Sequence, residues 1–201
     1  MSEVFTLRSA NIIILARNYN PSIVSKEWLY QKNIIKETVA NFIHTPPLSL
    51  VETERVSFVL DEDSLRISLK TISPEGIEAL PKIATKFVSC LSETPFKAVG
   101  FNYGYHIAKE SSRLEALFSP NSAKLKELFS GSYEIGEVVN FPFKPFIVRM
   151  RALPSSEEAT TIPIDFNFHS DSQDAKAVEE RLGLHPQTME KAEGILRGLS
   201  K

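Results

Sequence analysis

The clearest pattern in the chain is an alternation of apolar and polar positions between residues 55 and 70. Apolar side chains occupy every second position in 56–60 and again in 65–69, and the acidic stretch 61–63 separates the two runs. A repeat of two residues is typical of strands that turn one face to a core and the other to water. The pattern therefore predicts a β-hairpin.

Five more segments have the composition of strands. A run of isoleucines in 9–17 is typical of a strand that is buried on both faces. In 96–108, aromatic residues alternate with Gly100, Asn102 and Gly104, which predicts one aromatic face and one nearly bare face. Glycines inside a strand mark a bulge or the close approach of another group. Three further strands are expected at 133–141, 146–152 and 159–169.

Apolar residues at helical spacing predict one long helix, at 73–91. Ser73 is a good N-cap, Pro74 suits the first helical position, and an apolar stripe follows. Pro81 is expected to kink this helix or to start a second one. The prolines in 45–47 exclude regular structure there. Shorter helices are expected at 26–32, twice within 111–129, and twice after Ser172, where Gly183 and Pro186 separate the last pair.

The order of these elements defines the expected fold class. Runs of strands are followed by helices, which favours an α+β protein over a parallel α/β sheet. We predict one large, twisted antiparallel sheet with its helices packed on one face. Residues 1–201 then form a single domain, and the similar layout of 1–94 and 95–201 suggests a pseudo-duplicated β-x-ββ-α unit. The pattern leaves open whether the two halves share one sheet.

Three stretches carry a resemblance to other proteins: NIIILARNYNPSIVSKEWL, TPFKAVGFNYGYHI and IDFNFHS with the helical segment after it. In this layout the chain resembles a sporadically distributed family of uncharacterised prokaryotic proteins of unknown function, and the similarity covers most of the chain. The resemblance implies a prokaryotic, cytoplasmic α+β protein. It assigns no catalytic residue, because no motif in it is tied to an activity.

Composition and charge restrict the cellular compartments and the kinds of partner that can be expected. The chain has 201 residues, with 23 Lys and Arg against 25 Asp and Glu, and a net charge of -2. This balance argues against a protein that coats nucleic acids or anionic membranes. Cys90 is the only cysteine, so neither an internal disulfide nor a cysteine-based zinc finger can form. The N-terminal apolar run is too short to span a membrane, so we expect a cytoplasmic protein without a membrane partner.

The stretch PIDFNFHSD, at 163–171, holds the strongest candidates for chemistry. Its polar residues share one face of the predicted strand: Asp165, Asn167, His169 and Asp171. Such residue types bind hard metals or act as general bases. One hypothesis is a metal-assisted hydrolase that uses Asp165 and His169, with Asp171 as a further metal ligand. His106 or Asn102 would strengthen this site if either came alongside. The alternative is a solvated sheet face, which is how any half-buried strand looks.

Most catalytic signatures are missing from the chain. It has no GxSxG elbow, no Walker loop and no GxGxxG motif. Cys90 has no evident basic neighbour that would activate its thiol, and His44 and His185 look like loop residues beside prolines. We therefore expect no cofactor and favour a binding protein over an enzyme.

A non-enzymatic role in protein interaction or small-ligand binding is the function that these patterns favour. Tyr19, Trp28 and Tyr30 lie where no core stripe is evident, and aromatic residues in such places often anchor interfaces. A sheet with helices on one face leaves the other face to be covered, and pairing of two copies is a common solution. We expect a homodimer, with an unidentified protein or small ligand as a further partner.

Nucleic-acid binding is a third hypothesis. The stretch FPFKPFIVRMR, at 141–151, interleaves basic with aromatic and aliphatic residues. The basic residues that could line one exposed sheet face are Lys144, Arg149, Arg151, Arg55, Arg66 and Lys70. A basic sheet face with aromatic residues can bind single strands. The slightly negative net charge favours an ordinary solvated face instead.

Overall fold

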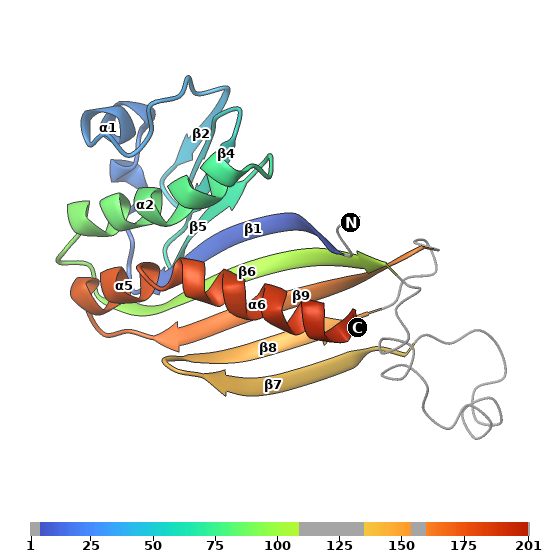
Figure 1. Cartoon of the computed structure of the whole chain (residues 1–201). Coiled ribbons are helices and arrows are strands. Elements are labelled where there is room, and N and C mark those ends of the chain that lie inside the picture. The colour runs from blue at the N-terminus through green and yellow to red at the C-terminus, as the bar shows by residue number, and fades with distance from the viewer. Residues whose placement is uncertain (1–4, 109–134, 154–159, 201) are drawn as a thin grey trace, which may run out of the picture.

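Nine strands of the described residues form one antiparallel sheet (Figure 1). The computed structural model describes residues 5–108, 135–153 and 160–200. The strands are β1 Phe5–Ala16, β2 Asn41–Thr45, β3 Leu48–Glu52, β4 Val56–Leu60, β5 Ser64–Leu69, β6 Phe96–Ala108, β7 Glu137–Phe143, β8 Phe146–Ala152 and β9 Thr161–Asp171. Their order across the sheet is β2-β3-β4-β5-β1-β6-β9-β8-β7. The predicted α+β class with a large antiparallel sheet is thus confirmed, and both halves of the chain contribute to the same sheet.

The centre of the sheet is the pair β1 and β6. In the first half of the chain, the last strand β5 pairs with β1; in the second half, the last strand β9 pairs with β6. The remaining strands extend the two flanks, toward β2 on one side and β7 on the other. The two halves therefore have the same layout around the β1–β6 pair, while their origin by duplication stays a prediction.

Three helices lie over one face of the sheet: α2 (Pro74–Cys90), α5 (Ala175–Leu182) and α6 (His185–Leu199) (Figure 1). We call this the covered face and its opposite the open face. The hydroxyl oxygen of Ser73 caps α2, because it accepts a hydrogen bond from the Gly76 amide at 3.1 Å. Pro81 lies inside one continuous helix, so the predicted second start is not present. The connection from β1 to β2 holds η1 (Pro21–Ile23) and α1 (Lys26–Gln31).

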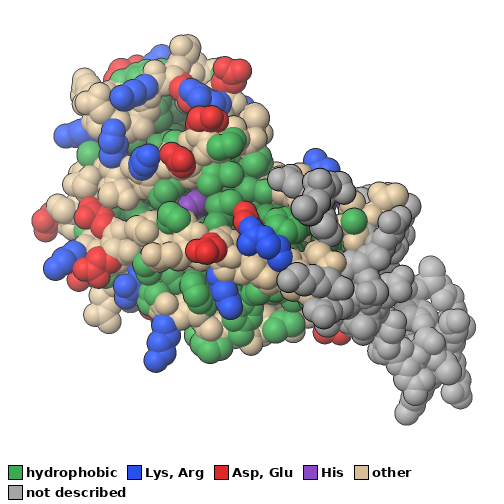
Figure 2. All heavy atoms as spheres, in the orientation of Figure 1, with side chains coloured by type: hydrophobic (Ala, Val, Ile, Leu, Met, Phe, Trp, Pro, Cys, Tyr) green, Lys and Arg blue, Asp and Glu red, His purple; other side chains and the backbone are tan. Residues whose placement is uncertain are grey.

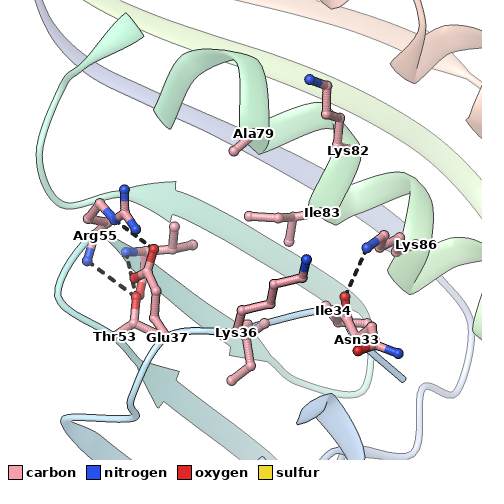
Figure 3. A pocket seen from close by; sticks show the side chains of 12 residues that line it. Asn33, Ile34, Lys36, Glu37, Thr53, Arg55, Ala79, Lys82, Ile83 and Lys86 are labelled. Carbon is pink, nitrogen blue, oxygen red and sulfur yellow. Dashed lines mark hydrogen bonds and ion pairs between the residues drawn. The ribbon is translucent and has the colours of Figure 1, made fainter. Parts of the chain in front are cut away.

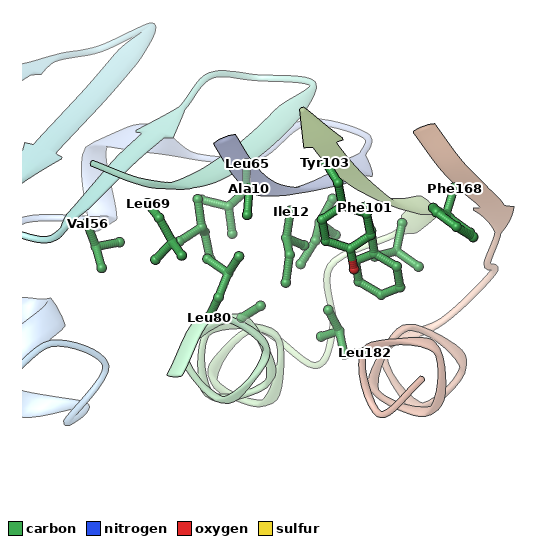
Figure 4. Close-up of a cluster of buried hydrophobic side chains, with 14 of the residues drawn as sticks. Ala10, Ile12, Val56, Leu65, Leu69, Leu80, Phe101, Tyr103, Phe168 and Leu182 are labelled. Carbon is green, nitrogen blue, oxygen red and sulfur yellow. The ribbon is translucent and has the colours of Figure 1, made fainter. Parts of the chain in front are cut away.

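The core fills the space between the covered face and the helices (Figure 4). Ile12 of β1, Phe101 of β6 and Phe168 of β9 are fully buried there, together with Leu80 of α2 and Leu182 of α5. Burial of each such side chain contributes roughly 1.5–3 kcal/mol. Since side chains alternate along a strand, every other residue of these strands is left on the open face.

Two strands that the sequence did not predict, β2 and β3, lie in residues 41–52, and His44, which was expected in a loop, belongs to β2. The prolines at 46 and 47 do stay outside the strands, in the turn between them. At the start of β3, the polar and apolar residues are on the opposite faces from those expected for a half-buried strand. Ser49 is buried and its hydroxyl donates to the Val24 carbonyl oxygen at 2.6 Å, while Leu50 belongs to the open face.

The helices that the sequence predicts within 111–129 lie outside the described residues, as does the start of the strand predicted at 133–141. The predicted helices after Ser172 are present, and the break between α5 and α6 is at 183–184 and includes Gly183, whereas Pro186 lies in the first turn of α6 and not between the helices. No helix in the described ranges has the length and apolar character needed to cross a membrane.

Candidate functional site

A continuous row of polar residues crosses the open face. Each member is the register partner of the next, so the row runs perpendicular to the strands from one edge of the sheet to the other. We call it the polar row, and in sheet order it comprises Asn41, Glu52, Ser57, Ser68, Asn11, Asn102, Asn167, Arg149 and Asn140.

The middle of the polar row is a ladder of three asparagine side chains. The Asn167 Nδ2 donates to the Asn102 Oδ1 at 2.7 Å, and the Asn102 Nδ2 donates to the Asn11 Oδ1 at 2.8 Å. Residues directly opposite each other on neighbouring strands have their Cβ atoms about 5 Å apart, which suits an amide-to-amide hydrogen bond. We call these three residues the amide ladder.

A hollow of about 460 Å³ lies beside the amide ladder, and glycine keeps it open. A Cβ on Gly104 would stand 2.5 Å from the Ser9 Oγ and 3.4 Å from the Asp165 Oδ1. A side chain at this position would therefore collide with the Ser9 side chain of β1. The polar walls of the hollow are formed by Ser9, Asn11, Asn102, Asn167, Arg149, Arg151 and Asp165. Gly104 thus marks a close approach of neighbouring side chains, which is one of the two roles expected for a glycine inside a strand.

The two arginines of the hollow differ in their partners. The Arg151 Nη2 and the Asp165 Oδ2 are 2.9 Å apart, and both side chains are about half exposed. Arg149 forms no hydrogen bond or ion pair with another described residue. A guanidinium group has a planar array of donors that matches a carboxylate or phosphate. Arg149 is therefore the group of the hollow that is best placed to bind an anion.

The predicted acid–base residues do not assemble into one centre. The His169 Nε2 contacts the Asp171 Oδ1 at 3.2 Å, whereas Asp165 is paired with Arg151. His106 is opposite Pro163 while His169 is opposite Gly100. The two histidines are consequently about 20 Å apart, at 3.3 Å per residue. In the part of the chain that the structure describes, no three His, Cys, Asp or Glu residues are grouped so that they could hold a metal ion.

The three predicted interface aromatics are used mainly inside the protein. Tyr19 is 4% exposed, and burial raises the pKa of its hydroxyl above the usual range. Trp28 packs edge-on against Phe87 of α2, with ring centroids 5.7 Å apart. Tyr30 is 38% exposed, and its hydroxyl donates to a backbone carbonyl and accepts from a backbone amide of the same connection. Tyr19 is therefore a core residue, and of the three only Tyr30 offers much surface.

The predicted basic residues are divided between several places. Arg66, Arg149 and Arg151 do share the open face. Lys144 lies in the turn between β7 and β8, outside the strands. Every Phe and Tyr in the described strands faces the covered side, so the open face has no phenyl or phenol ring for a base to stack on. Arg55 and Lys70 have partners of their own, Glu37 at 2.6 Å and Glu52 at 3.9 Å.

A second hollow, of about 260 Å³, lies between α2 and the connection at 33–37 (Figure 3). Lysines line it, and one of them, Lys86, fastens the connection to α2. The Lys86 Nζ donates to the Asn33 carbonyl oxygen at 3.1 Å, and Lys82 lies 3.9 Å from Glu78 on the same helix. We interpret this hollow as the seam between the connection and α2.

Comparison with known proteins gives no family for the chain. No protein-family model matches it, and no curated protein matches it either. The resemblance to the sporadically distributed prokaryotic family therefore stays a prediction. The amide ladder and the hollow are accordingly interpreted from their own chemistry.

Proposed function

We propose that this chain is a non-enzymatic binding module that holds a small anionic ligand in the hollow on the open face. The observation that carries the proposal is Arg149, a guanidinium without a described partner beside the amide ladder. The charges of Arg151 and Asp165 cancel each other, so the hollow keeps the positive charge of Arg149. The polar walls contain neither a histidine nor a cysteine, which supports binding rather than catalysis.

The hollow provides the two kinds of contact that a small anion needs. A carboxylate or phosphate can accept two parallel hydrogen bonds from one guanidinium group. The amide ladder next to it offers both N–H donors and an oxygen acceptor to the rest of the ligand. Because the three amides hold one another, little side-chain entropy is lost when a ligand binds them.

The test compares Arg149→Gln with Arg66→Gln, an arginine of the open face outside the hollow. Native mass spectrometry of protein purified without added metal would reveal any retained ligand, and calorimetric titration with inorganic phosphate and with acetate would probe the empty site. We expect binding to be lost in Arg149→Gln and kept in Arg66→Gln. Equal binding by both variants, or no retained mass and no heat with either probe, would contradict the proposal.

A homodimer formed through the open face is the second candidate. Beside the polar row, aliphatic residues occupy five positions of the neighbouring row, Ile43, Leu50, Val59, Ile13 and Ile147, and this row is interrupted by Arg66, Gly100 and His169. Ile147 is 60% exposed and Ile43 is 47% exposed. A second copy presenting the same row would bury both. The single cysteine supports a reducing compartment such as the cytoplasm for this assembly.

Light scattering of Ile147→Asp tests the dimer. A carboxylate buried in an apolar contact is costly, so we expect the variant to have the mass of one chain and the parent protein the mass of two. The matched control is Val139→Asp. Val139 is also an exposed aliphatic residue, but its side chain lies on the covered side of the sheet. A parent protein that already has the mass of one chain at high concentration would exclude the dimer.

A further inference from the structure

A groove on the covered side of the molecule is independent of the open face. It lies between α2 and the α5–α6 pair and has a volume of about 940 Å³. Its apolar walls are Ile77 and Pro81 of α2, Leu182 of α5, and Pro186 and Met189 of α6. Figure 2 shows apolar surface gathered between these helices, with histidine surface at its bottom. The size and the apolar character are those of sites for small molecules.

His185 lines this groove, although the sequence suggested a loop residue. It is the first residue of α6, is 2% exposed, and packs edge-on against the rings of Phe101 and Tyr103 at 5.3 and 5.6 Å. Its Nε2 is buried without a hydrogen-bond partner. Burial lowers the pKa of the ring to about 4, so the imidazole is neutral near neutral pH. A buried polar atom without a partner costs about 1–3 kcal/mol, and a ligand group that bonded it would recover part of that free energy.

The rim of the groove is acidic. Four glutamates line it against one lysine: Glu78, Glu179, Glu190 and Glu193, with Lys82. Glu78 is 3.9 Å from Lys82, and Glu193 is 2.8 Å from Arg197. Glu179 and Glu190 form no ion pair with a described residue. The rim is therefore complementary to a positively charged group.

We propose that the groove binds a small amphiphile with an aliphatic body and a protonated amine. The aliphatic body lies along Ile77, Pro81 and Met189. The ammonium group donates to the His185 Nε2, and the carboxylates of Glu179 and Glu190 balance its charge. Met189 is half-buried and has an unbranched side chain with several rotatable bonds, so it can change rotamer to admit the ligand.

The methionine methyl groups provide the experiment. The chain has three methionines, Met1, Met150 and Met189, and of the two that the structure describes, Met150 and Met189, only Met189 lines the groove. With ¹³C-labelled methyl groups, the variant Met189→Leu identifies the signal of Met189, while buried Met150 reports whether the fold is intact. The probes are decylammonium, decanol and decanoate, which share one chain and differ in the charge of the head. We expect decylammonium to shift the Met189 signal and to bind at least about tenfold more tightly than decanol or decanoate.

Two further variants test the place and the polar partner. Thr85→Trp fills the groove from α2, whereas Ser89→Trp adds the same ring one turn further along the helix, outside the groove. Binding of decylammonium should be lost in the first and kept in the second. His185→Phe should weaken binding of decylammonium and leave decanoate, which has no hydrogen to donate to the ring nitrogen, unchanged. The proposal is overturned if no probe moves the Met189 signal, if decanol or decanoate binds as tightly as decylammonium, or if His185→Phe has no effect.

Discussion

His185 shows what burial does to a single titratable residue. Packed between aromatic rings, it has a pKa of about 4 in the folded protein against 6.5 for an unperturbed ring. The unfolded chain therefore takes up a proton at a higher pH than the folded protein does. As the pH falls through the range between these two values, the unfolded state gains protons and becomes relatively more stable. The neutral ring therefore makes its full contribution to the free energy of unfolding above pH 6.5. This contribution is lost as the pH falls toward about 4.

We expect His185→Phe to remove part of the acid sensitivity of the fold. At about 1.4 kcal/mol per pH unit, the full effect of the histidine is on the order of 3 kcal/mol. The free energy of unfolding in urea, measured for both proteins from neutral pH down to about pH 4, gives the comparison. Carboxylates contribute equally to both proteins, so their effect cancels in the difference. Parallel pH profiles would show that His185 does not titrate as described.

Single residues also show where prediction from sequence ends. The polar parity of Asn102, Asp165 and Asn167 follows from simple alternation and was predicted. Asn11 was not singled out, because its hydrogen-bond partner Asn102 is 91 residues away and only the register of β1 on β6 brings them together. His185 was expected in a loop, because the proline after it was interpreted as a break between helices. In the structure, that proline lies in the first turn of the helix that His185 begins.

Among the elements, α2 depends most visibly on its local sequence. Its first turn has a serine cap, a proline and Glu75, all of which favour a helix start. Loss of the cap leaves an amide at the helix end without its partner. Because the inner side of α2 packs on β1 and β5, fraying of its start also weakens the core beneath it.

Ser73→Ala should therefore destabilise the protein by about 1 kcal/mol. Ser89→Ala is the control. This serine is exposed near the end of the same helix, and its hydroxyl donates to the Lys86 carbonyl oxygen, so it caps no amide at the helix start. Denaturant midpoints of the two variants and the parent give the comparison. Equal midpoints for both variants would mean that the cap contributes nothing measurable.

The elements also differ in how far the sequence determines them. The β4–β5 hairpin and α2 were predicted because their apolar residues recur with the spacing of a strand or a helix, and these are the residues that are buried. β2 and β3 were missed because a serine occupies a buried position of β3 and β2 is largely exposed, so neither shows the usual alternation. Tertiary contacts, rather than local propensity, make these residues a strand pair.

At the scale of the whole molecule, charge distinguishes the open face from a typical nucleic-acid surface. The net charge is -2, and of the arginines on the open face Arg151 is neutralised by Asp165. If the face does bind single strands, the binding must be weak and strongly dependent on salt. Arg149→Glu combined with Arg151→Glu should then abolish it. Fluorescence anisotropy with a labelled oligonucleotide at low salt is the measurement, and a parent protein without binding there rules out the hypothesis.

The central position of β1 has a consequence for the protein while it is being made. On the ribosome, β1 to β5 and α2 emerge before β6, whose residues begin at Phe96. Until then, one side of β1 has unpaired amides and carbonyls along its isoleucine-rich middle. A free strand edge of this kind is a template for strands of other chains. A nascent chain paused before β6 would thus be prone to co-aggregation, and completing the β1–β6 pair is the step that ends this vulnerable period.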